Sequence, residues 1–206
     1  MGRWESNARG RLEKAAMELY EERGFDQTTV AEIAARAGLT ERTFFRHYAD
    51  KREVLFGGSG MLAELLVATV AGAPGSAAPL DVVAAALAAV GVLLEESRGR
   101  GFARRRQGII AASAPLRERE LIKLASWADL VAGALRRRGV EEPTAILAAA
   151  AGLAVFRVAF DRWVGDGNEL DLPQLIRASL SDLKALAAAG HQRSAARTQR
   201  PVKADR

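Results

Sequence analysis

Hydrophobic positions recur with a helical period along nearly the whole chain, and strand-like alternation is almost absent. Leu12, Ala15, Leu19 and Tyr20 share one face of a first helix, which Gly24 ends. The same periodicity predicts further helices near residues 29–37, 40–48, 51–70, 80–97, 102–113, 115–138, 143–164 and 172–189. The pattern therefore predicts an all-α fold of about nine helices.

Local signals mark the start and end of the second and third helices. Thr29-Val30-Ala31-Glu32 is a capping box, in which a threonine and a glutamate satisfy free amides at a helix N-terminus. Gly38 ends this helix, because glycine adopts the left-handed backbone of a tight turn without strain. Thr40 then caps a third, short helix. Two short helices joined by a three-residue turn have the layout of a helix-turn-helix.

The third helix has one apolar face and one polar face. Ile33, Ala34 and Leu39 can pack the two helices together, with Phe44 and Tyr48 behind them. The opposite face carries side chains that can hydrogen-bond to base edges and phosphates: Glu41, Arg42, Thr43, Arg46 and His47. Phosphate is also bound favourably at helix N-termini, where we expect Thr29, Thr40 and Lys51.

Three glycines fall within four residues of the predicted fourth helix, at Gly57-Gly58-Ser59-Gly60. Each glycine costs about 1 kcal/mol relative to alanine inside a helix, so the segment predicts a kink or a break. A hinge between two domains and a tolerated local kink both remain open as interpretations.

Composition excludes several classes of site. The chain has no cysteine and two histidines, which rules out disulfides, thiolate-bound zinc, iron–sulfur clusters, a cysteine nucleophile and a multi-histidine metal site. Neither a phosphate-binding glycine loop nor a conspicuous pair of carboxylates is present. We therefore expect no catalytic residues, no metal, no cofactor and no enzyme activity.

The net charge of +5 is not spread over the chain. Residues 1–56 carry ten basic and ten acidic side chains, whereas residues 190–206 carry five basic and one acidic. Most of the excess thus lies in a C-terminal tail without apolar periodicity, which we expect to be disordered. Residues 36–52 are the one stretch where positive charge coincides with a structural pattern, with five basic and two acidic side chains.

Neither a leader nor a membrane span is expected. The first residues lack the apolar core of a signal peptide. The longest apolar runs, 82–94 and 145–156, are shorter than the roughly 20 residues that a bilayer span needs. These features predict a soluble, cytoplasmic protein with no membrane partner.

Residues 8–56 resemble the DNA-binding domain of TetR-family bacterial transcriptional regulators. The resemblance lies in the stretches Gly24-Phe25-Asp26-Gln27-Thr28-Thr29-Val30-Ala31-Glu32-Ile33-Ala34 and Gly38-Leu39-Thr40-Glu41-Arg42-Thr43-Phe44-Phe45-Arg46-His47-Tyr48, followed by Asp50-Lys51. It implies a helix-turn-helix domain over 1–52, a helical effector-binding and dimerisation domain over 53–190, and a basic tail over 191–206.

The resemblance also implies which residues bind double-stranded operator DNA. Carried over by position, these are Thr29, Thr40, Glu41, Arg42, Thr43, Phe45, His47 and Lys51. Phe45 departs from the family, which usually has a tyrosine that contacts phosphate at this place. Because phenylalanine lacks the hydroxyl, only an apolar contact with a sugar or a thymine methyl group remains.

The family uses its later helices to dimerise and to bind a small effector. The last two long helices have more apolar surface than one pair can bury, so we expect a homodimer through them. The expected pocket for a lipophilic or aromatic effector is lined by Leu62, Leu66, Phe102, Ile109, Trp127, Phe156 and Phe160. Gln107, Ser126 and Asp161 are either polar anchors of that pocket or surface residues.

The predicted function is that of a homodimeric repressor, released from a palindromic operator when an effector shifts its conformational equilibrium. Repression is the family's default and does not follow from the residues. Two alternatives remain: a DNA-binding protein with a filled core and no effector, and an α-helical carrier of small molecules that only resembles a regulator.

Overall fold

The computed structural model describes the backbone of residues 2–198 and the side chains of residues 8–189. Within 2–198 the chain forms nine α-helices, one short 3-10 helix and no strand, which confirms the all-α prediction. The elements are α1 (Gly2–Arg23), α2 (Val30–Arg36), α3 (Glu41–His47), η1 (Glu53–Phe56), α4 (Ser59–Gly72), α5 (Pro79–Ser97), α6 (Gly99–Ala112), α7 (Ala114–Arg137), α8 (Glu142–Val164) and α9 (Leu172–Thr198).

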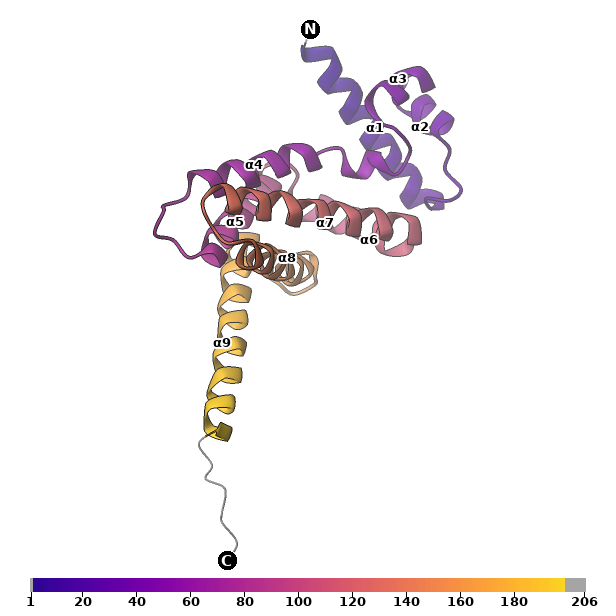
Figure 1. Cartoon of the computed structure of the whole chain (residues 1–206). Helices are drawn as coiled ribbons and strands as arrows, with labels where there is room; N and C mark the ends of the chain where they lie inside the picture. Colours follow the sequence, from indigo (N-terminus) through magenta and orange to yellow (C-terminus); the bar gives the residue numbers. More distant parts are fainter. Residues whose placement is uncertain (1, 199–206) are drawn as a thin grey trace, which may run out of the picture.

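Helices α1 to α3 and η1 form a small unit at one end of the molecule (Figure 1). Leu12, Ile33 and Phe44 are fully buried in its core, and each comes from a different helix. The core also includes Val54, Leu55 and Phe56 of η1 and, from further along the chain, Ile109, Ile110 and Leu116. Because η1 packs here, the packing favours a domain boundary after Phe56 over the predicted boundary at residue 52.

Helices α4 to α9 form a second core. α8 packs against both α7 and α9, and α5 packs against α4, α8 and α9. Side chains such as Leu66, Leu87, Val131 and Trp163 are fully buried between them. Since apolar burial contributes about 25 cal/mol per Å², this continuous core supplies most of the stability of the C-terminal part.

The predicted interruption of the fourth helix is a complete break. η1 ends at Phe56, Gly57 and Gly58 separate it from α4, and both glycines have right-handed helical backbone angles. A Cβ atom on Gly57 would lie 3.0 Å from the Tyr48 hydroxyl oxygen, so glycine here allows a close approach of the chain to the first core. Gly58 and Gly60 face open space.

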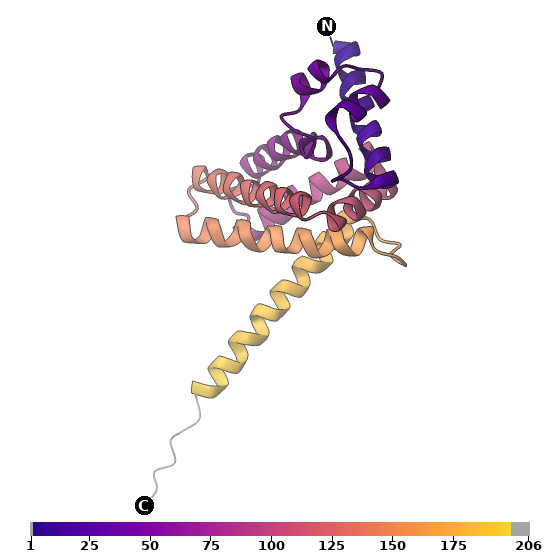
Figure 2. The same cartoon turned by 90° about the vertical axis from the view of Figure 1, so that its right-hand side faces the viewer.

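The last helix is longer than the sequence predicts. α9 continues to Thr198, past the expected stop at Gly190, and projects away from the body as a single rod (Figure 2). The prediction of a disordered tail over 191–206 is therefore wrong for residues 191–198, and residues 199–206 lie outside the described part. One glycine costs a helix only about 1 kcal/mol, and no proline lies between Gly190 and Pro201 to end the helix.

Two helical stretches are long and apolar enough to cross a membrane, Glu53–Gly72 and Glu142–Val164. The expectation of no membrane span counted only uninterrupted apolar runs, and this criterion misses helices that are apolar on average but contain a few polar residues. The first stretch is broken at Gly57–Gly58, and α8 contributes nine buried residues to the core. Core helices of soluble proteins pass the same test of length and composition, so this is weak evidence for a membrane span.

Charged side chains join the two cores. Glu53 of η1 pairs with Arg119 and with Lys123 of α7, the latter at 3.1 Å. Burial alone would raise the pKa of the Glu53 carboxyl, but hydrogen bonds from Arg119 and Lys123 and their charges outweigh it and hold the pKa below 4.5. Arg106 of α6 donates to the Leu55 carbonyl oxygen at 2.8 Å and lies over the Phe56 ring.

At Gly152 helix α8 lies directly against Val83 of helix α5, and this close contact gives a first prediction. A Cβ atom there would overlap Val83 Cγ1 and lie 3.2 Å from Val83 Cβ, which cannot swing away. Gly152→Ala should therefore lower the free energy of unfolding by about 1–3 kcal/mol through overpacking. Urea titration followed by circular dichroism measures this change.

Gly108→Ala is the matched control, because Gly108 is also helical but a Cβ atom there would meet nothing within 4 Å. It should raise stability by up to about 1 kcal/mol, the usual gain for alanine in a helix. Equal stabilisation by both alanines would show that α5 and α8 do not approach each other this closely.

The pairing of Glu53 predicts a pH dependence of stability. A carboxyl whose pKa is lowered by folding stabilises the native state above its unfolded pKa, and this contribution is lost as pH falls through the folded pKa. Glu53→Gln should therefore lower stability by about 1–3 kcal/mol at pH 7, and the difference from wild type should narrow below pH 4.5.

Denaturant titrations of both proteins between pH 3 and pH 7 measure that difference. Glu64→Gln is the control, since Glu64 lines the same region but is exposed and forms no ion pair among the described residues. A gap between wild type and Glu53→Gln that stays constant over the whole pH range would contradict the assigned pairing.

Candidate DNA-binding site

Helix α3 is positioned by its cap and by its apolar side. The Thr40 hydroxyl accepts a hydrogen bond from the Thr43 amide at 3.2 Å, which satisfies a free donor at the helix start. Phe44 is fully buried and Tyr48, the residue that ends the helix, is 4% exposed. With these rings in the core, the other side of the helix has to face outward.

The outward side carries most of the residues predicted to bind DNA. Glu41, Arg42, Phe45 and Arg46 are exposed, and Thr43 and His47 are half-buried. Arg42, Thr43, Phe45 and Arg46 line an open hollow of about 420 Å³ on the surface of α3. The structure thus brings the predicted residues of α3 together as one polar surface with a single aromatic ring in it.

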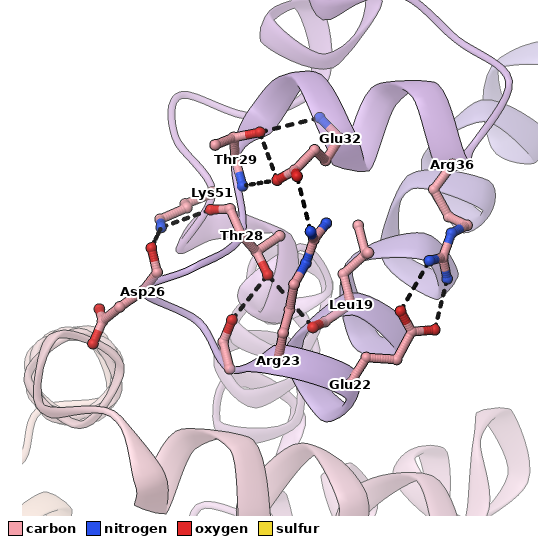
Figure 3. A network of polar contacts seen from close by, with 10 residues as sticks. Leu19, Glu22, Arg23, Asp26, Thr28, Thr29, Glu32, Arg36 and Lys51 are labelled. Carbon is pink, nitrogen blue, oxygen red and sulfur yellow. Dashed lines mark hydrogen bonds and ion pairs between the residues drawn. The ribbon is translucent and has the colours of Figure 1, made fainter.

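Thr29 at the start of α2 is also exposed, and its polar atoms form the predicted capping box (Figure 3). Its amide and its hydroxyl each donate to Glu32 at 2.8 Å, and the Glu32 amide donates back to the hydroxyl at 3.3 Å. Arg23 adds an ion pair with Glu32 at 2.9 Å. The Thr29 backbone bond, its hydroxyl bond and Arg23 together lower the pKa of Glu32.

Lys51 lies at the start of the turn before η1, with its side chain directed into the α1–α2 loop (Figure 3). Its ammonium group donates to the carbonyl oxygens of Phe25 and Thr28, both at 2.8 Å, and to that of Asp26 at 3.4 Å. The Tyr20 hydroxyl donates to the Lys51 carbonyl oxygen at 2.7 Å. Lys51 therefore stabilises the loop that leads into α2. If Lys51 also contacts a phosphate, as predicted, it has both roles.

An ion pair that joins α1 to α2 is not predicted from the sequence. Arg36 donates to the two carboxylate oxygens of Glu22, both at 2.9 Å (Figure 3). It also donates to Glu18 at 3.4 Å. The hydrogen bonds from Arg36 lower the pKa of Glu22. These residues are 14 and 18 positions apart, so no local sequence pattern identifies the pair.

The seven residues predicted to line an effector pocket do not form one group. Leu62, Leu66, Trp127, Phe156 and Phe160 belong to the core of α4–α9, whereas Phe102 and Ile109 pack with the first core. Among the candidate anchors, Ser126 and Asp161 are exposed, and half-buried Gln107 lies 3.4 Å from Glu120. The apolar periodicity of α6 predicts that Phe102 and Ile109 are buried, but it does not indicate which of the two cores they join.

A second hollow, of about 640 Å³, lies at the junction between the two cores. His47, Arg52, Glu53, Arg119 and Lys123 are among its lining residues, together with Phe56 and Met61. It is polar and open, and it lies next to the end of α3. Neither this hollow nor the one on α3 is lined by any of the predicted effector residues.

Two family models match the chain. Residues 12–56 match the model of the bacterial regulatory proteins of the TetR family, and residues 77–188 match the MftR C-terminal domain. The second match alone covers more than half of the chain.

Curated relatives agree with these models. MftR of Mycobacterium tuberculosis, whose name assigns it to the regulation of mycofactocin biosynthesis, is 26% identical over 81% of this chain and 84% of its own. The transcriptional regulator TcmR of Streptomyces glaucescens is 35% identical over 82 residues, 40% of this chain and 36% of TcmR. The chain thus matches little more than a third of TcmR.

Solved structures agree on the fold. SmeT, a repressor from Stenotrophomonas maltophilia, is 23% identical in its complex with triclosan, with a TM-score of 0.59 over 85% of this chain and 90% of SmeT. FadR from Bacillus subtilis in complex with stearoyl-CoA is 19% identical, with a TM-score of 0.54 over 83% of this chain and 95% of FadR. The chain belongs to the TetR family of bacterial transcriptional regulators.

Proposed function

We propose that the protein is a homodimeric repressor that binds a palindromic operator through α3 and is released by a lipophilic effector. The observation that carries the proposal is the outward side of α3. Arg42 and Arg46 are exposed there and form no ion pair or hydrogen bond among the described residues. Guanidinium groups that no carboxylate neutralises are free to bind base edges and phosphates.

The exposed apolar surface of α8 supports a dimer. Leu147 and Val158 are 70% and 52% exposed, and exposed Ala150 and Ala154 lie between them at helical spacing. The projecting part of α9 adds Leu186, which is 72% exposed. A second copy related by a two-fold axis would bury both faces, and a two-fold dimer suits a palindrome with half-sites about one DNA turn apart.

The core of α4–α9 is the part that would take an effector. The rings of Trp127, Phe156 and Phe160 lie in a row there, with centroids 6.3 and 5.8 Å apart. SmeT holds triclosan and FadR holds stearoyl-CoA, and both ligands have large apolar parts. We place a lipophilic effector among these rings, where its binding favours a dimer whose two α3 helices no longer match the operator.

A constitutive DNA-binding protein is the second candidate. It is favoured by the close packing of the rings, because Trp127 and Phe156 are 8% and 6% exposed and fill the space between their helices. A small molecule that releases the protein from DNA distinguishes the two. In either case the predicted location is the cytoplasm, where the DNA is.

Footprinting on the DNA upstream of the protein's own gene and its neighbours tests the DNA-binding function. We expect a protected palindrome at near-physiological salt. Arg42→Ala should weaken binding at least tenfold, because one bidentate contact between arginine and guanine contributes about 1–3 kcal/mol and the dimer makes two.

Arg137→Ala is the matched control for that experiment. Arg137 is exposed at the end of α7, far along the chain from α3, and its removal should leave the footprint unchanged. Equal loss of binding by both variants would indicate that the arginines act only through the net charge of the protein.

The proposed dimer interface gives another prediction. Leu147→Glu places a charge on the exposed face of α8, twice per symmetric interface, and should convert the dimer to monomers in analytical ultracentrifugation. Leu121→Glu is the control, since Leu121 is 57% exposed on α7 and the proposed interface does not include it. Dissociation by Leu121→Glu but not by Leu147→Glu would move the interface to α7.

A further inference from the structure

Phe45 is an exposed aromatic ring that the fold does not use. Its side chain is 55% exposed and belongs to neither hydrophobic core, although Phe44 next to it is fully buried. The two rings meet edge to face, with centroids 5.5 Å apart and planes at 80°. This contact restrains the Phe45 ring against the helix while its outer part stays open to solvent.

The surroundings of Phe45 combine one apolar group with two cations. Arg42 and Arg46 lie one helical turn from each other, and both line the hollow of about 420 Å³ with Phe45 and Thr43. Elsewhere in the described chain, exposed arginines such as Arg36, Arg52 and Arg104 pair with carboxylates. The hollow on α3 therefore offers an apolar ring beside guanidinium donors that bind no acceptor among the side chains of residues 8–189.

These groups match particular base edges in the major groove. A guanidinium group donates to the O6 and N7 acceptors of guanine, and an apolar side chain packs on the methyl group of thymine. The ring has no donor for a phosphate oxygen. The amino groups of adenine and cytosine need an acceptor, and neither a phenylalanine ring nor an arginine provides one.

The spacing along α3 relates the two contacts. Arg42 and Phe45 are three residues apart, about 4.5 Å along the helix axis, and successive base pairs are about 3.4 Å apart. A helix lying along the groove thus brings the two side chains to neighbouring base pairs. We propose that Phe45 is a specificity-determining residue that contacts a thymine methyl group beside the guanine bound by Arg42.

This inference rests on the proposed operator binding and adds a base preference to it. Each half-site then contains a thymine and a guanine at adjacent base pairs. In vitro selection from a random duplex library with the full-length protein identifies the preferred site. We expect this pair of bases in every selected half-site, and selection with Phe45→Ala should keep the guanine and lose the preference for thymine.

The decisive measurement replaces that thymine with deoxyuracil, which removes the methyl group and leaves every hydrogen-bonding group in place. Burial of one methyl group contributes about 0.8 kcal/mol, so the dissociation constant of the wild type should rise about fourfold for one half-site and about fifteenfold for both. Phe45→Ala should bind the two duplexes equally. Phe45→Tyr keeps the ring and should keep the discrimination.

Leu121→Ala is the matched control, because it also removes an exposed apolar side chain but lies on α7. It should discriminate between the duplexes as the wild type does. Selection of a defined palindrome whose thymines can all be replaced without loss of affinity would overturn the role of Phe45 and leave the operator function intact. Failure to select any sequence would reject both.

Discussion

The burial of Phe44 is the constraint on which the candidate DNA-binding surface of α3 depends. α3 has seven residues, and an isolated helix shorter than about 12 residues is marginal in water. Its stability and direction therefore come from packing. With Phe44 fully buried and Tyr48 almost so, Arg42, Phe45 and Arg46 have to point away from the core. One buried ring thus determines which side chains a partner can reach.

The same surface also needs a rigid support, which polar groups provide. Lys51 holds the carbonyl oxygens of the α1–α2 loop, and the buried hydroxyl of Thr28 donates to the Gly24 carbonyl oxygen at 2.9 Å. Burial and the neighbouring Asp50 raise the pKa of Tyr20, and its hydroxyl donates to the Lys51 carbonyl oxygen. These bonds fix the path of the chain into α2, which positions α3.

Features encoded by neighbouring residues could be predicted from the sequence, and features encoded by distant residues could not. The capping box at Thr29, the cap at Thr40 and the break at Gly57–Gly58 each depend on residues within a few positions. The paired hydrogen bonds between Arg36 and Glu22 join two different helices. The apolar face of α6 with Phe102 and Ile109 packs in the first core, and periodicity alone does not indicate which core a helix joins. The sequence therefore predicts the helices and their caps correctly, but it does not predict which helices pack against or pair with one another.

Helix α6 touches both halves of the molecule, as α7 also does, and this bears on how the proposed effector would act. Arg104 donates to the carbonyl oxygens of Val164 and Gly165, both at 2.7 Å, and so holds the end of α8. From the same helix, Arg106 bonds to the Leu55 carbonyl oxygen and Ile109 packs in the first core.

We therefore expect a shift of α8 to be transmitted along α6 to η1, which directly follows the segment that carries α3. In the proposed function, a ligand among the rings of Trp127, Phe156 and Phe160 would push on α8, because Phe156 and Phe160 lie on that helix. Since packed cores move between discrete arrangements and do not deform continuously, we expect a small displacement there to be enough to reorient the DNA-binding unit.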